Sequence, residues 1–172
     1  MENTFGIPII PDNDRERLEK LYSYNVIDRY DEDGIFKHVA AMAAKIFKVP
    51  IALVSLVDKE HVIFKGNVGM EGTDIVSRGA SLCSLAVLND GVTVFENAKE
   101  EPCLLSNPLV AGDFGLKFYA GAPIRTPDGF NIGTVCVVDK KVREFTEEDQ
   151  RLLEGLATAV MTELEDRQLA GE

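Results

Sequence analysis

The chain has 172 residues, of which 18 are basic and 29 acidic, so its formal net charge at pH 7 is −11. This length is that of about one domain, and such a chain buries enough surface to fold without disulfides or a structural metal. A sequence pI of about 4.7 leaves no basic field that would attract phosphates. We therefore expect no nucleic acid and no anionic membrane among its partners.

The N-terminal residues carry no basic segment and no apolar stretch long enough for a signal peptide. The longest apolar runs, such as 39–44, are far shorter than the roughly 18 residues that cross a bilayer. The three cysteines, Cys83, Cys103 and Cys136, are odd in number and form no C-x-x-C pair, which is typical of reduced thiols. These features predict a cytoplasmic protein without a disulfide framework.

Two helices are predicted in the first third of the chain. Residues 1–13 show little periodicity and are interpreted as an N-terminal arm. Asn13 and Glu16 have the spacing of a capping box, which predicts a helix over 14–24. Apolar residues then recur at intervals of three and four, which predicts a second helix over 33–48.

The middle of the chain mixes short strands with irregular segments. The β-branched run 51–57 predicts a central strand, and 62–65 follows so closely that the two form an antiparallel hairpin. A short helix is expected over 81–88 and a strand over 92–95. Residues 96–115, rich in Asn, Pro and Gly, are interpreted as a structured loop, and loops of this length are often functional.

The last third of the chain predicts a second hairpin and a long helix. Strands over 116–124 and 133–139 are joined by a turn at 127–129. A final helix begins at Thr146, with acidic residues in its first turn that favour the positive end of the helix dipole. This order of elements predicts an α+β domain in which helices flank an antiparallel sheet.

Familiar catalytic motifs are absent from the sequence. It contains no nucleophile elbow, phosphate loop, zinc-protease helix or dinucleotide fingerprint. His38 and His61 lack the spacing of a metal site, and we interpret them as surface or packing residues. The acidic cluster Asp28, Asp31, Glu32 and Asp33 lacks the alternation of a calcium loop, so helix capping is favoured over cation binding. We therefore predict neither a metal nor a cofactor.

The cysteines leave two interpretations open. Cys83 follows Arg78 near the start of a predicted helix, where a cation and amide dipoles could lower its pKa. The alternative is inert packing, because buried free cysteine often acts as a small apolar residue. Cys136 alternates within a valine-rich strand and is interpreted as core.

Several ordered phrases together resemble a GAF domain of the bacterial signalling type, over residues 14–167, with 168–172 as a C-terminal tail. The phrases are residues 50–58, Phe64 with Gly69, Arg78 with Ser81 and Cys83, 107–110, 118–124 and 129–139. The resemblance implies about six antiparallel strands, with the N- and C-terminal helices on one face and a small-molecule pocket on the other. The short helix at Ser81 and the loop between Phe95 and Leu116 would close that pocket.

The resemblance also implies which residues line or rim the pocket. These are Phe64, Ser81, Cys83, Leu85, Asp113, Phe118 and Tyr119. Leu82 and Leu85 stand where relatives often have an aromatic residue and a histidine, which makes the site more apolar and disfavours haem, metal or acid–base chemistry. The cyclic-nucleotide pattern of some GAF domains and the Cys-His pair that accompanies bilin attachment are missing.

Three functions follow as hypotheses. The first is a stand-alone sensory GAF domain that binds a small molecule and signals as a homodimer or through a separate kinase or cyclase, since 1–13 and 168–172 are too short for an output domain. Its final helix could pair with a second copy through Leu153, Ala157, Val160 and Leu164, or this stripe packs on its own sheet.

The second hypothesis is a thiol-dependent free methionine sulfoxide reductase that uses Cys83 and Cys103. The third is a degenerate scaffold that binds only protein. The lack of a catalytic motif favours a binding module over an enzyme.

Overall fold

One six-stranded antiparallel sheet organises the residues that the computed structural model describes, 2–27 and 34–171. The strand order is β3-β2-β1-β6-β5-β4. In chain order the strands are β1 (Ile51–Val57), β2 (His61–Val68), β3 (Ile75–Ser77), β4 (Thr93–Phe95), β5 (Phe118–Arg125) and β6 (Asn131–Asp139). The α+β fold class and the antiparallel sheet predicted from the sequence are confirmed.

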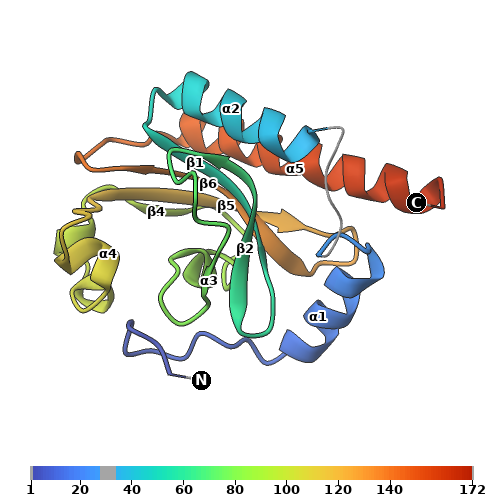
Figure 1. Cartoon of the computed structure of the whole chain (residues 1–172), viewed down its shortest axis with the longest axis horizontal. Helices are drawn as coiled ribbons and strands as arrows, with labels where there is room; N and C mark the ends of the chain where they lie inside the picture. Colours follow the sequence, from blue (N-terminus) through green and yellow to red (C-terminus); the bar gives the residue numbers. More distant parts are fainter. Residues whose placement is uncertain (1, 28–33, 172) are drawn as a thin grey trace.

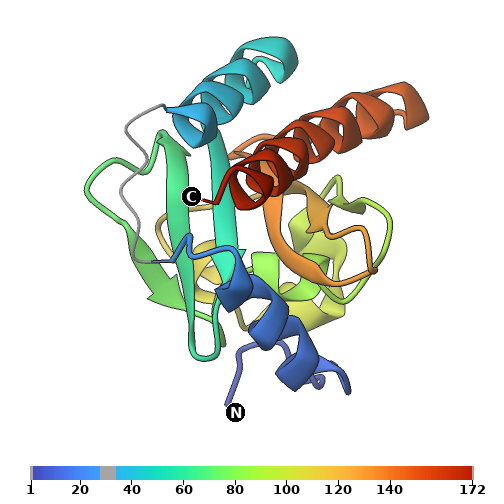
Figure 2. The same cartoon turned by 90° about the vertical axis from the view of Figure 1, so that its right-hand side faces the viewer.

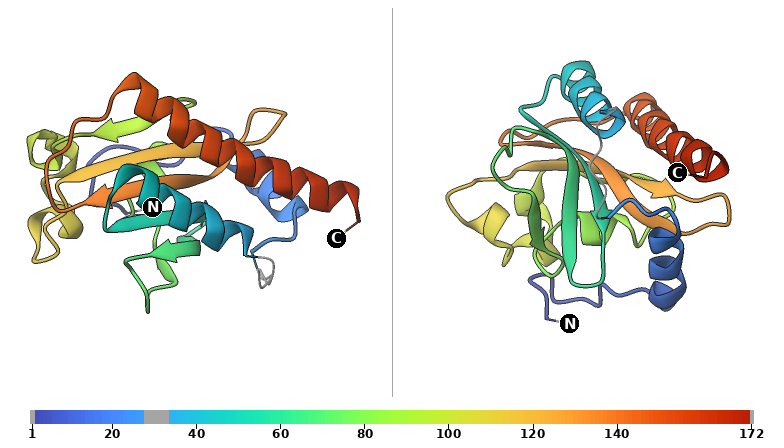
Figure 3. Two further views of the ribbon diagram at one scale, coloured as in Figure 1. Left: turned by 90° about the horizontal axis from the view of Figure 1, so that it is seen from above. Right: turned by 45° about the vertical axis from the view of Figure 1, so that its right-hand side comes forward.

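Helices cover both faces of this sheet. They are α1 (Asp14–Ser23), α2 (Ile35–Phe47), α3 (Cys83–Ala86), α4 (Pro108–Ala111) and α5 (Glu147–Leu169), with 3-10 turns at Ala98–Glu100 and Pro102–Leu104. Helices α2 and α5 lie side by side on one face (Figures 1 and 3), while α3 and α4 lie on the other (Figure 1). Helix α1 lies at one end of the sheet (Figure 2). The helix that lies beside α5 is therefore α2 and not the N-terminal helix α1.

Alternation along the central strands divides the core into two clusters. All residues of β1 and β6 are buried, because each strand has protein on both sides. Phe118 of β5 packs against Phe145 on the face covered by α2 and α5, which we call the helix side. Its neighbour Tyr119 points to the opposite face and lies near α3. On the helix side, α2 approaches β2 so closely that a Cβ at Gly66 would lie 2.2 Å from the carbonyl oxygen of Phe36. Only glycine fits there.

The helix boundaries agree with the sequence pattern, but one cap does not. Asn13 makes no side-chain capping hydrogen bond at the start of α1. Thr146 and Asp149 form the full capping box at the start of α5. The segment predicted as the loop 96–115 contains two 3-10 turns and α4. The acidic cluster at 28–33 lies outside the described residues.

The apolar stripe of α5 packs on the protein's own sheet. Leu153, Ala157, Val160 and Leu164 are each at most 3% exposed and belong to the core cluster on the helix side. These side chains are therefore not available to a second copy, and placing them at a dimer interface was wrong. Burial against the sheet removes the same apolar surface from water that a partner helix would.

Among the described residues, no helix combines the length and apolar character that a membrane crossing requires.

Candidate functional site

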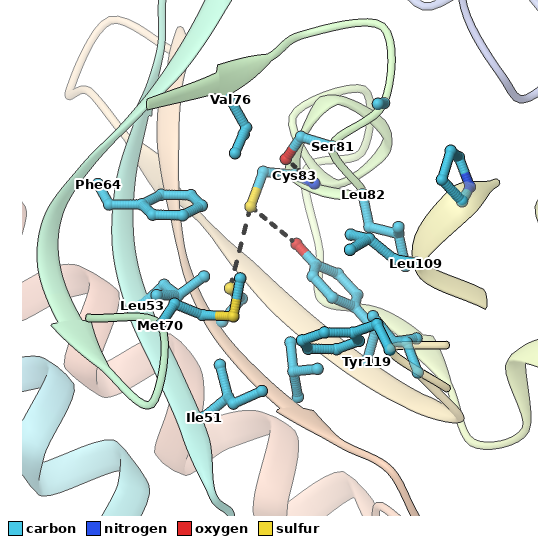
Figure 4. Close-up of a pocket in the computed structure, with 16 residues that line it drawn as sticks. Ile51, Leu53, Phe64, Met70, Val76, Ser81, Leu82, Cys83, Leu109 and Tyr119 are labelled. Atoms are coloured by element: carbon cyan, nitrogen blue, oxygen red, sulfur yellow. Dashed lines mark hydrogen bonds between the residues drawn. The ribbon is translucent and has the colours of Figure 1, made fainter. Parts of the chain in front are cut away.

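A cavity of about 180 Å³ lies between the sheet and the segments that carry α3 and α4. None of its lining side chains is charged, and most are aliphatic, aromatic or sulfur-containing (Figure 4). The lining comprises Ile51, Leu53, Phe64, Met70, Val76, Ala80, Ser81, Leu82, Cys83, Pro108, Leu109, Phe114, Leu116, Tyr119, Cys136 and Val138. We call this cavity the apolar pocket.

The apolar pocket has a buried floor and a partly exposed rim. Leu53, Tyr119 and Cys136 rise from the central strands β1, β5 and β6, and each is at most 6% exposed. The rim side chains come from two opposing walls, with Val76 on β3 and Leu109 on α4, and both are only partly buried. A ligand that enters would therefore contact the edge of the sheet and α4 together.

The polar atoms at the floor converge on the sulfur of Cys83. Ser55 Oγ and Thr134 Oγ1 each donate to Cys83 Sγ at 3.2 Å. Tyr119 Oη donates to the same sulfur at 3.5 Å, and Cys136 Sγ lies 3.9 Å from it (Figure 4). We call these five residues the thiol cluster.

The register of the sheet explains why the thiol cluster forms. Ser55 and Thr134 are directly paired across β1 and β6, two positions from the pair of Leu53 with Cys136. Residues two apart on a strand share a face, so these four side chains point toward α3. Cys83, the first residue of α3, reaches down onto them.

Glycine at position 121 makes room for the phenol of Tyr119. Gly121 is paired with Cys136 across β5 and β6, so a side chain there would project onto the pocket floor. A Cβ at this position would lie 2.5 Å from Tyr119 Oη. The missing side chain allows the ring to lie along its own strand and direct its hydroxyl at Cys83.

The electrostatics of the thiol cluster favour a thiolate at Cys83. Hydrogen bonding from Cys136, followed by that from the three hydroxyls, lowers the pKa of Cys83 below its ordinary value, although burial opposes this. Donation to Cys83 raises the pKa of Cys136, and burial raises that of Tyr119, so both keep their protons. These hydrogen bonds therefore favour ionisation of Cys83 over ionisation of Cys136.

The same cluster also accommodates a protonated Cys83. Ser55 Oγ and Thr134 Oγ1 lie 3.0 Å apart as well as 3.2 Å from the sulfur, and each hydroxyl carries one proton. Those two protons can both point at a thiolate. When Cys83 is a thiol, its own proton adds a third donor, so that the sulfur and the two hydroxyl oxygens can each donate one hydrogen bond to another of the three atoms. The side chains need not move for the proton to leave.

Four of the residues predicted to line the pocket do so: Phe64, Ser81, Cys83 and Tyr119. Phe118 does not, because strand alternation turns it to the helix side. Leu85 points to the other side of α3, where it lines a separate surface hollow with Cys103. Asp113 is exposed and is not among the lining residues. Cys136 was predicted as core and is both core and floor, which the alternation from Thr134 could have indicated.

Arg78 serves the fold and not the thiol. It is fully buried and donates from Nη2 and Nη1 to the Asp14 carboxylate at 2.7 and 3.0 Å. Arg17, also buried, donates from Nε to Asp14 at 2.9 Å and from Nη1 to the carbonyl oxygen of Val57. This network fixes α1 to the end of the sheet, and the groups that lower the pKa of Cys83 are uncharged.

The N-terminal arm closes the pocket side of the molecule. Phe5 and Ile9 are at most 3% exposed and belong to the core cluster of that side. Asn107, which caps α4, donates from Nδ2 to Thr4 Oγ1 and to the carbonyl oxygen of Ala80, both at 2.9 Å. The arm, the segment before α3 and the start of α4 are thus joined at one buried amide.

No group of three or more His, Cys, Asp and Glu side chains capable of holding a metal occurs in the described part of the chain.

The family model for the GAF domain matches residues 31–164 of this chain. The chain belongs to the GAF domain family. A cyclic di-GMP phosphodiesterase from Pseudomonas aeruginosa is 32% identical over 158 residues, which are 91% of this chain and 27% of that enzyme. The present GAF chain thus spans about a quarter of the length of this curated relative.

Solved structures show the same fold at lower identity. The GAF domain of a phosphoenolpyruvate-protein phosphotransferase from Acinetobacter has a TM-score of 0.67 at 15% identity and covers 94% of this chain and 98% of its own. A free methionine-R-sulfoxide reductase from Neisseria meningitidis, in complex with its substrate, has a TM-score of 0.66 at 20% identity and covers 91% and 90%. At these identities the likeness concerns the fold.

Proposed function

We propose that this GAF domain is a sensory module that binds one small apolar molecule in the apolar pocket. The observation that carries the proposal is a cavity of about 180 Å³ whose lining contains no Asp, Glu, Lys, Arg or His side chain. An engineered cavity of about 150 Å³ with aliphatic and aromatic walls holds benzene, so the size suits a single aromatic ring or a short branched hydrocarbon. The few polar groups of the lining are the hydroxyl of Ser81 and the members of the thiol cluster that reach the floor, where one hydrogen-bonding group of the ligand would be recognised.

The composition of the lining argues against strongly polar ligands. Phosphate and carboxylate groups need charged or multiple hydrogen-bonding partners when they leave water. The apolar pocket offers hydroxyls and thiols at its floor and no cation among its lining residues. A cyclic dinucleotide, the substrate class named for the Pseudomonas relative, is therefore not the ligand proposed for this site.

The signal would pass from the pocket to an output protein. The rim joins β2 and β3 of the sheet to α4, so occupancy would restrain α4 relative to the sheet that supports α2 and α5. The relative from Pseudomonas combines a similar domain with a phosphodiesterase, which supports a signalling enzyme as the recipient. Kinases and cyclases remain within this proposal, as does a homodimer built without the buried stripe of α5.

Thermal unfolding with toluene as the probe tests the binding proposal. We expect toluene to raise the unfolding temperature in a concentration-dependent way, because it binds the folded state only. Val76→Phe, at the pocket rim, should weaken this effect by at least about tenfold in affinity, or roughly 1.4 kcal/mol. Ile75→Phe is the matched control, since Ile75 is 54% exposed on the same strand and does not line the pocket.

Equal stabilisation of wild type and Val76→Phe, or none of either, would reject binding in the apolar pocket. If toluene stabilises the wild type more than Val76→Phe, native mass spectrometry of the purified protein would identify the natural ligand among co-purifying molecules.

A thiol-dependent free methionine sulfoxide reductase is the second candidate. It is favoured by Cys83 and Cys136, whose sulfurs lie 3.9 Å apart inside the pocket. Cys103, which the sequence suggested as the second thiol, lines a separate hollow. The reductase ranks below the sensor because the carboxylate of a free amino acid would meet no Lys, Arg or His side chain in the lining. Thioredoxin-coupled turnover of methionine sulfoxide that is lost in Cys83→Ser would establish this activity.

The third hypothesis, a scaffold whose pocket is filled by its own side chains, is disfavoured by the cavity of about 180 Å³.

A further inference from the structure

Two free cysteines from distant parts of the sequence meet at the floor of the apolar pocket. Cys83 begins α3, Cys136 lies in the middle of β6, and their sulfurs are 3.9 Å apart. We propose that these two thiols are a redox pair that a small apolar organic hydroperoxide oxidises to an intramolecular disulfide. The proposal rests on the proposed function, since the same pocket must admit the hydroperoxide.

The geometry distinguishes this pair from the third cysteine. A disulfide bond is about 2.0 Å long, so the sulfurs must approach by the rotation of a side chain and a small shift of α3. Cys103 is partly exposed and lines a different hollow, on the side of α3 that carries Leu85. It is therefore placed to react with solvent oxidants and not with the pocket pair.

The thiol cluster supplies what an attacking sulfur needs. Hydroxyl donors from Ser55 and Thr134 at 3.2 Å stabilise negative charge on Cys83 Sγ before attack. The phenol of Tyr119, 3.5 Å from the same sulfur, is placed to donate a hydrogen bond to a peroxide oxygen that reaches it. Cys136 keeps its proton until the second step, because it donates toward Cys83.

The reaction balances in two steps. In the first, the sulfur of Cys83 attacks the terminal oxygen of R–OOH, an S–O bond forms and the O–O bond breaks. The leaving alkoxide takes up the proton that the Cys83 thiol lost, which gives a sulfenic acid and the alcohol R–OH. In the second, the sulfur of Cys136 attacks the sulfenic sulfur, the S–O bond breaks, and water leaves with the thiol proton. Two thiols lose two electrons in total, and the peroxide gains them.

The oxidant class follows from the walls of the pocket. Apolar side chains line most of the pocket above the sulfur, so an organic hydroperoxide about one ring in size gains binding energy that hydrogen peroxide does not. Closure of the disulfide would remove Cys83 from its hydroxyl donors and draw α3 toward β6. Oxidation would thus change the wall of the same pocket that binds the proposed ligand.

The test uses the full chain with cumene hydroperoxide as the probe. We expect peptide mapping without reductant to show a Cys83–Cys136 disulfide, formed at least about tenfold faster than with equimolar hydrogen peroxide. Cys136→Ser should stop at a sulfenic acid on Cys83, trapped by dimedone. Cys83→Ser should form no pocket adduct, and Cys103→Ser, the matched control, should react like wild type. Val76→Phe should slow cumene hydroperoxide more than hydrogen peroxide.

The outcomes separate this proposal from ligand binding. Toluene stabilisation without a Cys83–Cys136 disulfide overturns the redox proposal and leaves the binding proposal standing. A disulfide that forms without toluene stabilisation rejects the binding proposal instead. Equal rates with both peroxides, or no dimedone adduct at Cys83 in folded Cys136→Ser, overturn the assignment of oxidant and of nucleophile, respectively.

Discussion

Neutralising Asp14 should destabilise the domain strongly, because this carboxylate compensates two buried guanidinium groups. Arg17 and Arg78 are at most 1% exposed, and Asp14 accepts three hydrogen bonds of 2.7 to 3.0 Å from them. One further nitrogen of each arginine, Arg17 Nη2 and Arg78 Nε, is buried without a hydrogen-bond partner among the described residues. The substitution Asp14→Asn would leave both charges buried without the carboxylate that accepts their hydrogen bonds.

The expected loss is about 3–5 kcal/mol, the range measured when one partner of a buried ion pair is removed. Domains have total stabilities of about 5–15 kcal/mol, so this loss is a large share. In a chain of this size it corresponds to a fall in Tm of about 6–20 °C. Equilibrium unfolding in urea, followed by circular dichroism, measures the difference directly.

The effect should also depend on pH with a definite sign. Burial alone would raise the pKa of Asp14, but hydrogen bonds from Arg78 and Arg17 lower it below the ordinary value. A carboxyl group whose pKa is lower in the folded state stabilises the protein above its unfolded pKa of about 3.9, and this stabilisation is lost as the pH falls. The difference in the free energy of unfolding between wild type and Asp14→Asn should therefore become smaller below about pH 4.

Glu19→Gln is the control for the Asp14 substitution. Glu19 pairs with Arg15 at 3.5 Å on the surface, where both side chains are more than 60% exposed, their exposures being 68% and 87%. Its loss should cost no more than about 0.5 kcal/mol. A cost for Asp14→Asn as small as this would refute the argument that the carboxylate holds the buried network together.

Three further outcomes are expected. Leu153→Ala should lower the free energy of unfolding in urea by about 2–5 kcal/mol, because Leu153 is fully buried. Leu152→Ala, at a position 47% exposed, should lower it by less than about 1 kcal/mol. Similar losses for the two variants would contradict the packing of α5. In the Cys103→Ser variant, the rate of Cys83 alkylation should rise with pH and level off. The midpoint of this profile should lie below about 8.5, because the pKa of Cys83 is lowered in the folded state. A midpoint above 8.5 would show that burial outweighs the donors. Gly121→Ala should displace the phenol of Tyr119 and raise the midpoint of the same pH profile, because the sulfur loses one hydrogen-bond donor; an unchanged midpoint would show that this donor is unimportant.

Much of the fold could be predicted because its signals are local. The β-branched run that becomes β1, the turn that joins β5 to β6 and the capping box of α5 each depend on residues close together in sequence. The order of phrases along the chain then identified the family, and with it the pocket side of the sheet. Phe64, Ser81, Cys83 and Tyr119 were placed correctly on that basis.

The remaining errors concern which face a residue occupies and what meets it there. A shift of one position along β5 separates Phe118, under α5, from Tyr119, under α3, and the sequence does not state which set faces the ligand. Likewise the stripe of α5 fits a sheet or a partner helix equally well by its spacing. Only the packing shows that the sheet takes it.

The sequence alone, with 172 residues, 18 basic and 29 acidic, determined one acidic α+β domain of the GAF family with three cysteines and no familiar catalytic motif. The tertiary structure decided that Cys83 and Cys136, separated by 53 positions, come within 3.9 Å, while Cys103 lies elsewhere. The physical reason is that strand register and the docking of α3 set these distances, and both depend on contacts between residues far apart in the chain. The chemistry of the pocket therefore follows from the fold.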